Sequence, residues 1–137
     1  MTDKFDGEGE PMRVLLADDQ PKVRSALRLL LSQEPDVEVV GEAADTETLL
    51  ALAKATQPDL VILDWGLPGL HTTDPMSALR ACRPNASLVV LSGRPEIRQR
   101  ALAAGADAFV SKGDPPRRLL TTLRQYGAQT GGDGGGR

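Results

Sequence analysis

The sequence is poor in the residues that form covalent cross-links and aromatic cores. Cys82 is the only cysteine, so no internal disulfide can form, which fits a reducing compartment. Aromatic residues make up 3% of the chain, so aliphatic side chains must fill the core. The first residues lack the apolar centre of a signal peptide, and no apolar run approaches the roughly 20 residues that cross a membrane. We therefore expect a cytoplasmic protein with no membrane partner.

The charge is small overall but unevenly distributed. The formal net charge is −3, which does not favour direct nucleic-acid binding by this domain. Residues 1–79 have 6 basic and 15 acidic side chains, net −9, whereas residues 80–137 have 10 basic and 4 acidic, net +6. The basic half could contact an acidic partner, but we interpret its arginines as solvated helix faces.

The two ends of the chain differ in composition from its centre. Residues 1–11 are polar and acidic, and we expect a disordered lead-in. Residues 127–137 are rich in glycine, which is typical of a flexible tail or the start of a linker. One domain over residues 12–126 remains.

Within residues 12–126, short apolar runs alternate with amphipathic segments. The runs are rich in Val, Leu and Ile without strict alternation, as in strands buried on both faces of a parallel sheet. The segments between them have helical spacing, seen best in the stripe Val23, Ala26, Leu27, Leu30 and Leu31. The predicted strands are 12–17, 37–43, 60–64, 87–92 and 108–111, and the predicted helices are 21–33, 46–57, 74–83, 95–104 and 115–126. This order predicts an α/β fold, a doubly wound five-stranded parallel sheet with five helices.

Residues that favour helix ends agree with these boundaries. Prolines lie near the first turn of four predicted helices. Asp45 and Asp114 are candidate N-caps, and Gly105 is a candidate terminator.

Polar side chains follow four of the five predicted strands. Asp18 and Asp19 follow the first strand, Asp64 ends the third, Ser92 ends the fourth and Lys112 follows the fifth. In a parallel sheet these strand ends meet at one edge, where ligands bind. Three carboxylates repel one another there, and hard oxygen ligands with room for water suit Mg²⁺. Each residue alone has an ordinary explanation as a cap, turn or surface residue. Together they predict a phosphoryl-accepting metal site, with one carboxylate as the nucleophile.

Four motifs resemble the receiver domain of bacterial response regulators over residues 12–126. They are V-L-L-A-D-D (14–19), V-I-L-D-W-G-L-P-G (61–69), V-V-L-S-G (89–93) and A-D-A-F-V-S-K (106–112). The first motif, together with P-D-V-E-V-V-G-E-A (35–43), is most similar to receivers that precede LuxR-type DNA-binding domains. The resemblance implies the CheY-like form of the flavodoxin-like fold.

The resemblance also implies roles for individual residues. Asp64 would be the phosphoacceptor, and Asp18, Asp19, Asp64 and the carbonyl of Gly66 would hold Mg²⁺. Lys112 and Ser92 would bind the phosphoryl group, and Ser92 and Phe109 would form the switch. The donor would be a sensor histidine kinase or a phosphotransfer protein. A downstream effector would bind the face formed by segments 95–104, 108–111 and 115–126, and a homodimer is a further expected partner.

The sequence departs from the family pattern at a few positions. Gly66 lies two residues after the acceptor, where the family often tunes the lifetime of the phosphoryl group, and Gly113 stands where many receivers have proline. Leu70, His71 and Thr72 replace a frequent Asp-Gly. We interpret His71, the only histidine, as incidental rather than as a ligand. Trp65 is interpreted as a partly exposed neighbour of Asp64 and a fluorescent reporter.

Several functions need the same residues and stay open at this point. The leading hypothesis is a phosphorylation-controlled binding module, stand-alone or part of a DNA-binding transcriptional regulator. A phosphorelay intermediate is the second. We do not expect an enzyme, because phosphohydrolases of this type usually have a carboxylate where Gly66 stands. The complete acidic set argues against a scaffold without phosphorylation, and no basic recognition helix is seen.

Overall fold

The computed structural model describes residues 10–71 and 74–131, which form one α/β unit. The strands are β1 (Met12–Ala17), β2 (Val37–Ala43), β3 (Leu60–Asp64), β4 (Ser87–Ser92) and β5 (Ala108–Ser111). The helices are α1 (Pro21–Ser32), α2 (Thr46–Thr56), α3 (Pro75–Cys82), α4 (Arg98–Ala103) and α5 (Pro116–Gly131), and a 3₁₀ turn η1 (Pro95–Ile97) precedes α4.

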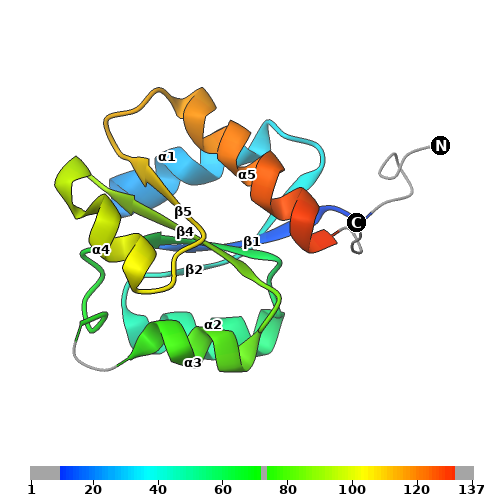
Figure 1. Ribbon diagram of the computed structural model, residues 1–137. Coiled ribbons are helices and arrows are strands. Elements are labelled where there is room, and N and C mark those ends of the chain that lie inside the picture. Colours follow the sequence, from blue (N-terminus) through cyan, green and yellow to red (C-terminus); the bar gives the residue numbers. More distant parts are fainter. Residues whose placement is uncertain (1–9, 72–73, 132–137) are drawn as a thin grey trace.

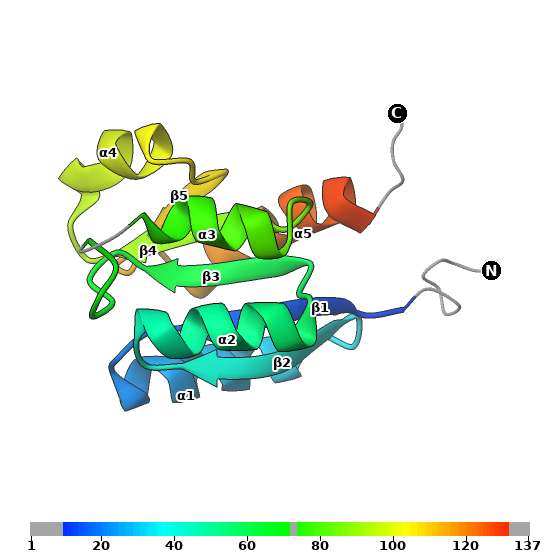
Figure 2. The same cartoon turned by 90° about the horizontal axis from the view of Figure 1, so that it is seen from below.

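All five strands are parallel, in the order β2-β1-β3-β4-β5. Figures 1 and 2 show α1 and α5 on one face of the sheet and α2 and α3 on the other. After β1 and β2, the chain crosses back over β1 and adds β3, β4 and β5 on the other side of it, so the order of strand addition reverses between β1 and β3. The predicted doubly wound fold is confirmed. Such a reversal opens a crevice at the carboxyl ends of the central strands.

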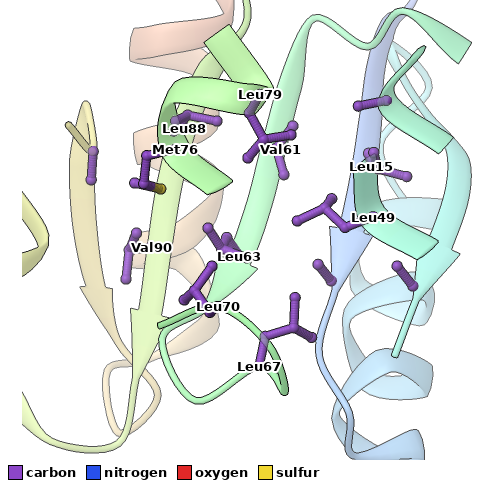
Figure 3. Packing of buried hydrophobic residues seen from close by; sticks show 14 of the residues in the cluster. Leu15, Leu49, Val61, Leu63, Leu67, Leu70, Met76, Leu79, Leu88 and Val90 are labelled. Carbon is purple, nitrogen blue, oxygen red and sulfur yellow. The ribbon is translucent and has the colours of Figure 1, made fainter. Parts of the chain in front are cut away.

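Each face of the sheet covers its own hydrophobic cluster. The cluster beneath α2, α3 and α4 includes Leu15, Leu49, Leu63, Leu79 and Val90 (Figure 3). The cluster on the other face joins Leu31 of α1 and Leu119 and Leu123 of α5 to strands β1, β3, β4 and β5. Because the central strands contact both clusters, β3 and β4 are buried along their whole length. This explains why the inner residues of both strands are apolar without alternation.

The predicted helical stripe of α1 is only partly buried. Leu31 lies in the core, and Leu27 and Leu30 pack against its edge. Ala26, which shares the helical spacing of this stripe, is exposed. Leu29 is the one large apolar side chain among the described residues that is exposed, with 64% of its surface accessible to solvent.

The element boundaries agree with the sequence predictions to within a few residues, with two larger differences. The segment predicted as one helix over 95–104 is the turn η1 followed by the short α4. Helix α5 continues to Gly131, five residues into the segment predicted as a flexible tail. Residues 1–9 and 132–137 lie outside the described part, so the lead-in and the end of the tail stay predictions.

Two of the three predicted helix-end residues act as expected. The Asp45 carboxylate accepts the Thr48 N–H at 2.8 Å and caps α2. Gly105 follows α4 with φ of +116°, a conformation that favours glycine. Asp114 does not cap α5, because its carboxylate accepts the N–H of Ser111 at 3.2 Å.

No helix in the described ranges combines the length and apolarity needed to cross a membrane.

Candidate functional site

The carboxyl ends of the strands bring the predicted polar residues to one edge of the sheet. Asp18 and Asp19 leave β1, and Asp64 is the last residue of β3. β1 and β3 are paired neighbours, with Ala17 opposite Leu63. One carboxylate oxygen from each of Asp18, Asp19 and Asp64 lies within 4.8 Å of the others. The structure therefore assembles the predicted acidic group.

Burial differs among the three carboxylates. Asp18 is 1% exposed and Asp64 is 7% exposed, whereas Asp19 faces solvent. The Oδ1 atom of Asp18 accepts the N–H of Gln20 at 2.9 Å, which fixes this carboxylate at the start of α1. Its Oδ2 atom is buried and accepts no conventional hydrogen bond from the described residues. A buried carboxylate needs a positive neighbour to remain ionised.

Lys112 supplies that positive charge from the end of β5. Its Nζ atom lies 2.8 Å from Asp18 Oδ2 and 3.2 Å from Asp64 Oδ1. Burial alone would lower the pKa of Lys112, but the two carboxylates outweigh it and raise that pKa. The lysine is therefore a fixed cation that joins β5 to the two central strands.

Asp64 lies in a less favourable environment for its charge. Burial raises its pKa most, and the negative charge of Asp18 raises it further. Lys112 and the backbone N–H of Gly66 lower it, without reversing the net upward shift. The site as a whole keeps an excess of negative charge beside Asp64.

Three carboxylates and one ammonium ion leave a formal charge of −2 at the site. Carboxylate oxygens close together, one of them open to solvent, suit a hard divalent cation that keeps some of its water. The donor set therefore fits a metal ion of this kind.

Ser92 ends β4 and Phe109 lies on β5, the strand that leads to Lys112. Ser92 is 6% exposed, and its Oγ atom accepts the N–H of Arg94 at 3.0 Å. Its carbonyl oxygen accepts the N–H of Lys112 at 2.8 Å, so the serine and the lysine are directly linked. Phe109 is half-buried against the cluster beneath α4. Ser92 therefore lies at the predicted edge of the sheet, whereas Phe109 lies further back on β5, opposite Val90.

The loop after β3 packs against Asp64. A Cβ atom at Gly66 would lie 3.6 Å from Asp64 Oδ2, so any side chain there would stand beside the carboxylate. Gly69 has φ of +87°, and the N–H of Thr46 donates to the carbonyl of Pro68 at 2.9 Å. These contacts tie the loop to the start of α2.

One contact in this loop was not foreseen. The Nε2 atom of His71 lies 2.8 Å from the carbonyl oxygen of Trp65. The two rings meet edge to face, with centroids 4.6 Å apart. His71 is exposed, as expected, but it has a definite partner. No spacing rule connects these residues, so only the loop geometry reveals the contact.

Comparisons with known proteins agree with this arrangement. The family described as response regulator receiver domain matches residues 14–124. The nitrate/nitrite response regulator NarL of Escherichia coli strain K12 is 37% identical over 121 residues, which cover 87% of this chain and 56% of NarL. The chain thus spans little more than half the length of this relative.

Two solved structures are similar over most of the chain. A LuxR-family two-component response regulator from Aurantimonas has a TM-score of 0.78 and 30% identity, covering 87% of this chain and 86% of that one. A NarL signal receiver domain from Mycobacterium tuberculosis has a TM-score of 0.78 and 31% identity, covering 87% and 98%. The family match, the fold and the acidic edge lead to one conclusion: the chain belongs to the response regulator receiver domains of two-component systems, and is most similar to the NarL and LuxR type.

Proposed function

We propose that Asp64 is the phosphoacceptor of this receiver domain. The observation that supports this role is the contact of its buried carboxylate with Lys112, beside Asp18 and Asp19. Of the three clustered carboxylates, Asp64 is the one that belongs to a strand itself, and the residue two positions later, Gly66, has no side chain. An incoming phosphoryl donor therefore meets little steric hindrance from position 66.

Mg²⁺ is the metal ion that we assign to the acidic group. Asp18, Asp19, Asp64 and the carbonyl of Gly66 would hold it, with water completing the coordination. When bound, the ion neutralises charge on the phosphoryl oxygens during transfer. The upward shift in the pKa of Asp64 supports the need for such a charge.

In the proposed reaction, an oxygen of the Asp64 carboxylate attacks phosphorus. The bond between phosphorus and the leaving group breaks, and the electron pair of that bond stays with the leaving group. The leaving group is a histidine nitrogen of a kinase or phosphotransfer protein, or the acetate of acetyl phosphate. The product is an acyl phosphate on Asp64, and hydrolysis by water restores the carboxylate.

Lys112 and Ser92 are proposed to bind the new phosphoryl group. The Lys112 ammonium ion can exchange its bond to Asp64 for one to a phosphoryl oxygen, and the Ser92 hydroxyl can donate to another. Because the Ser92 carbonyl is bonded to the Lys112 N–H, movement at Ser92 affects β5. Phe109 on this strand would turn inward as Ser92 moves. This couples the phosphoryl group to the α4–β5–α5 face.

The output is proposed to be altered binding of a partner rather than a released product, so the domain itself is not an enzyme. A sensor histidine kinase or phosphotransfer protein supplies the phosphoryl group. The similarity to NarL and LuxR-type regulators supports a role in transcription control through an effector domain. Arg98, Arg100 and Arg117 are exposed on α4 and α5 and have no ion pair within the described residues. They favour an acidic surface on the effector or on a second copy of the chain.

The test is intact mass after incubation with Mg²⁺ and acetyl phosphate, while Trp65 fluorescence is followed. We expect a labile gain of one phosphoryl group that requires Mg²⁺ and is lost in Asp64→Asn. Asp59→Asn is the matched control, because Asp59 pairs with Arg83 at the opposite end of β3. This control variant should still gain the group. Equal phosphorylation of Asp64→Asn and wild type would refute the assignment.

A further inference from the structure

The contact between His71 and Trp65 reaches the acceptor through a single peptide unit. The Trp65 carbonyl and the Gly66 N–H belong to the same planar amide. The Trp65 carbonyl faces Nε2 of His71 at 2.8 Å. On the other side, the backbone of Gly66 packs against the Asp64 carboxylate, with an ideal Cβ position 3.6 Å from Oδ2. The Gly66 N–H is close enough to that carboxylate to lower the pKa of Asp64.

The rest of the loop leaves this peptide unit few other restraints. The Trp65 N–H donates to the Leu91 carbonyl, and the Leu67 N–H donates to the Asp64 carbonyl at 3.1 Å. These two hydrogen bonds hold the chain on either side of the Trp65–Gly66 amide, but neither of them involves the carbonyl oxygen of that amide. The described partner of that oxygen is His71.

We propose that His71 is a positioning residue that donates a hydrogen bond to the Trp65 carbonyl and so keeps the Gly66 N–H directed at the Asp64 carboxylate. The proposal rests on the proposed role of Asp64 as phosphoacceptor. It gives a function to a histidine that its exposed position alone would not suggest.

The chemistry of the contact fixes the direction of donation. A carbonyl oxygen can only accept, so Nε2 of His71 must be protonated. A hydrogen bond donated to the oxygen of an amide polarises that amide, and the N–H of the same amide then becomes a stronger hydrogen-bond donor. The edge-to-face packing of the two rings holds the imidazole in the orientation that this bond requires.

Two substitutions separate the hydrogen bond from the ring contact. His71→Gln retains an amide N–H at nearly the reach of Nε2, but it removes the ring. His71→Phe retains a ring for Trp65, but it removes the donor. The first readout is the amide proton chemical shift of Gly66 in ¹⁵N-labelled protein without Mg²⁺. The second is the initial rate of phosphorylation by acetyl phosphate with saturating Mg²⁺.

We expect His71→Phe to move the Gly66 amide proton upfield and to slow phosphorylation about fivefold, the effect of losing one ordinary hydrogen bond. His71→Gln should keep both values close to wild type, within about twofold for the rate. An unchanged Gly66 shift in His71→Phe would overturn the proposal. So would equal losses in both variants, because the ring contact and not the donor would then be responsible. If the wild type takes up no phosphoryl group, the proposed function fails, and the Gly66 shift alone still decides the role of His71.

Discussion

Asp64 shows how single residues set the energetics of the site. Burial and the neighbouring Asp18 raise its pKa above the ordinary value of 3.8. A carboxyl group whose pKa is higher in the folded state adds stability below its unfolded pKa, and this stability is lost as the pH rises through the folded value. At neutral pH the ionised Asp64 therefore destabilises the metal-free fold.

Asp64→Asn should raise the free energy of unfolding at pH 7 without Mg²⁺. The expected gain is about 1.4 kcal/mol for each unit by which the pKa is raised. The gain should disappear near pH 3, because the carboxyl group of wild-type Asp64 is then neutral, like the asparagine side chain of the variant. Urea unfolding at the two pH values measures the difference. Glu38→Gln serves as the control, because this exposed carboxylate lies on β2 and should have little effect. Lower stability of Asp64→Asn at pH 7 would contradict the expected balance of charges.

The residues of the acidic edge could be predicted from the sequence, because strand ends are visible in it. Asp18, Asp64 and Lys112 each follow an apolar run, and parallel strands bring such ends together. The sequence could not predict the specific pairs. Lys112 contacts Asp18 as well as Asp64, and His71 contacts Trp65, because side-chain directions and loop geometry decide these contacts.

The helix ends illustrate what limits prediction at the level of elements. Asp45 caps α2 as expected, because a cap interacts only with its own first turn. Asp114 follows the same pattern but bonds back to Ser111, and α5 begins at Pro116. The glycines after residue 126 predicted a tail, yet α5 continues through the first of them to Gly131. Propensity alone therefore placed this boundary too early.

Gly105 and Gly93 form a matched pair for testing the end of α4. A Cβ atom meets nothing within 4 Å at either position, but only Gly105 has a positive φ, of +116°. Gly105→Ala should lower the free energy of unfolding by about 1–2 kcal/mol through backbone strain, whereas Gly93→Ala should leave it nearly unchanged. Chemical denaturation of both variants tests this. Similar losses in the two variants would show that backbone conformation is not the cause.

Across the whole molecule, the two halves of the sequence occupy opposite edges of the sheet. β2 and β1 belong to the acidic half of the chain, and β4 and β5 belong to the basic half. The order β2-β1-β3-β4-β5 thus turns a charge difference along the sequence into one across the molecule. The acidic site lies in the acidic half, where β1 meets β3, and Lys112 approaches it from the basic half.

The proposed binding of Mg²⁺ at this site should stabilise the entire domain, because the ion would bind the folded state. At a concentration 100 times the dissociation constant, the gain is about 2.7 kcal/mol. Thermal unfolding with and without Mg²⁺ measures it. Asp19→Asn should reduce the gain. Asp19 is exposed, so its substitution leaves the Asp18–Lys112 ion pair intact. An equal Mg²⁺ effect in this variant would exclude Asp19 as a ligand.

The position of β5 in the sheet has a consequence for local opening. β5 has four residues and pairs with β4 alone, whereas β1 and β3 each lie between two strands. In native-state hydrogen exchange, the amide protons of β1 and β3 should exchange with solvent only through global unfolding, whereas those of β5 should exchange through smaller, local openings. Asp18 and Asp64 are therefore attached to strands that should exchange slowly, whereas Lys112 follows an edge strand that should open more readily. One side of the site should therefore be rigid, and the other compliant enough for Lys112 to follow the proposed phosphoryl group.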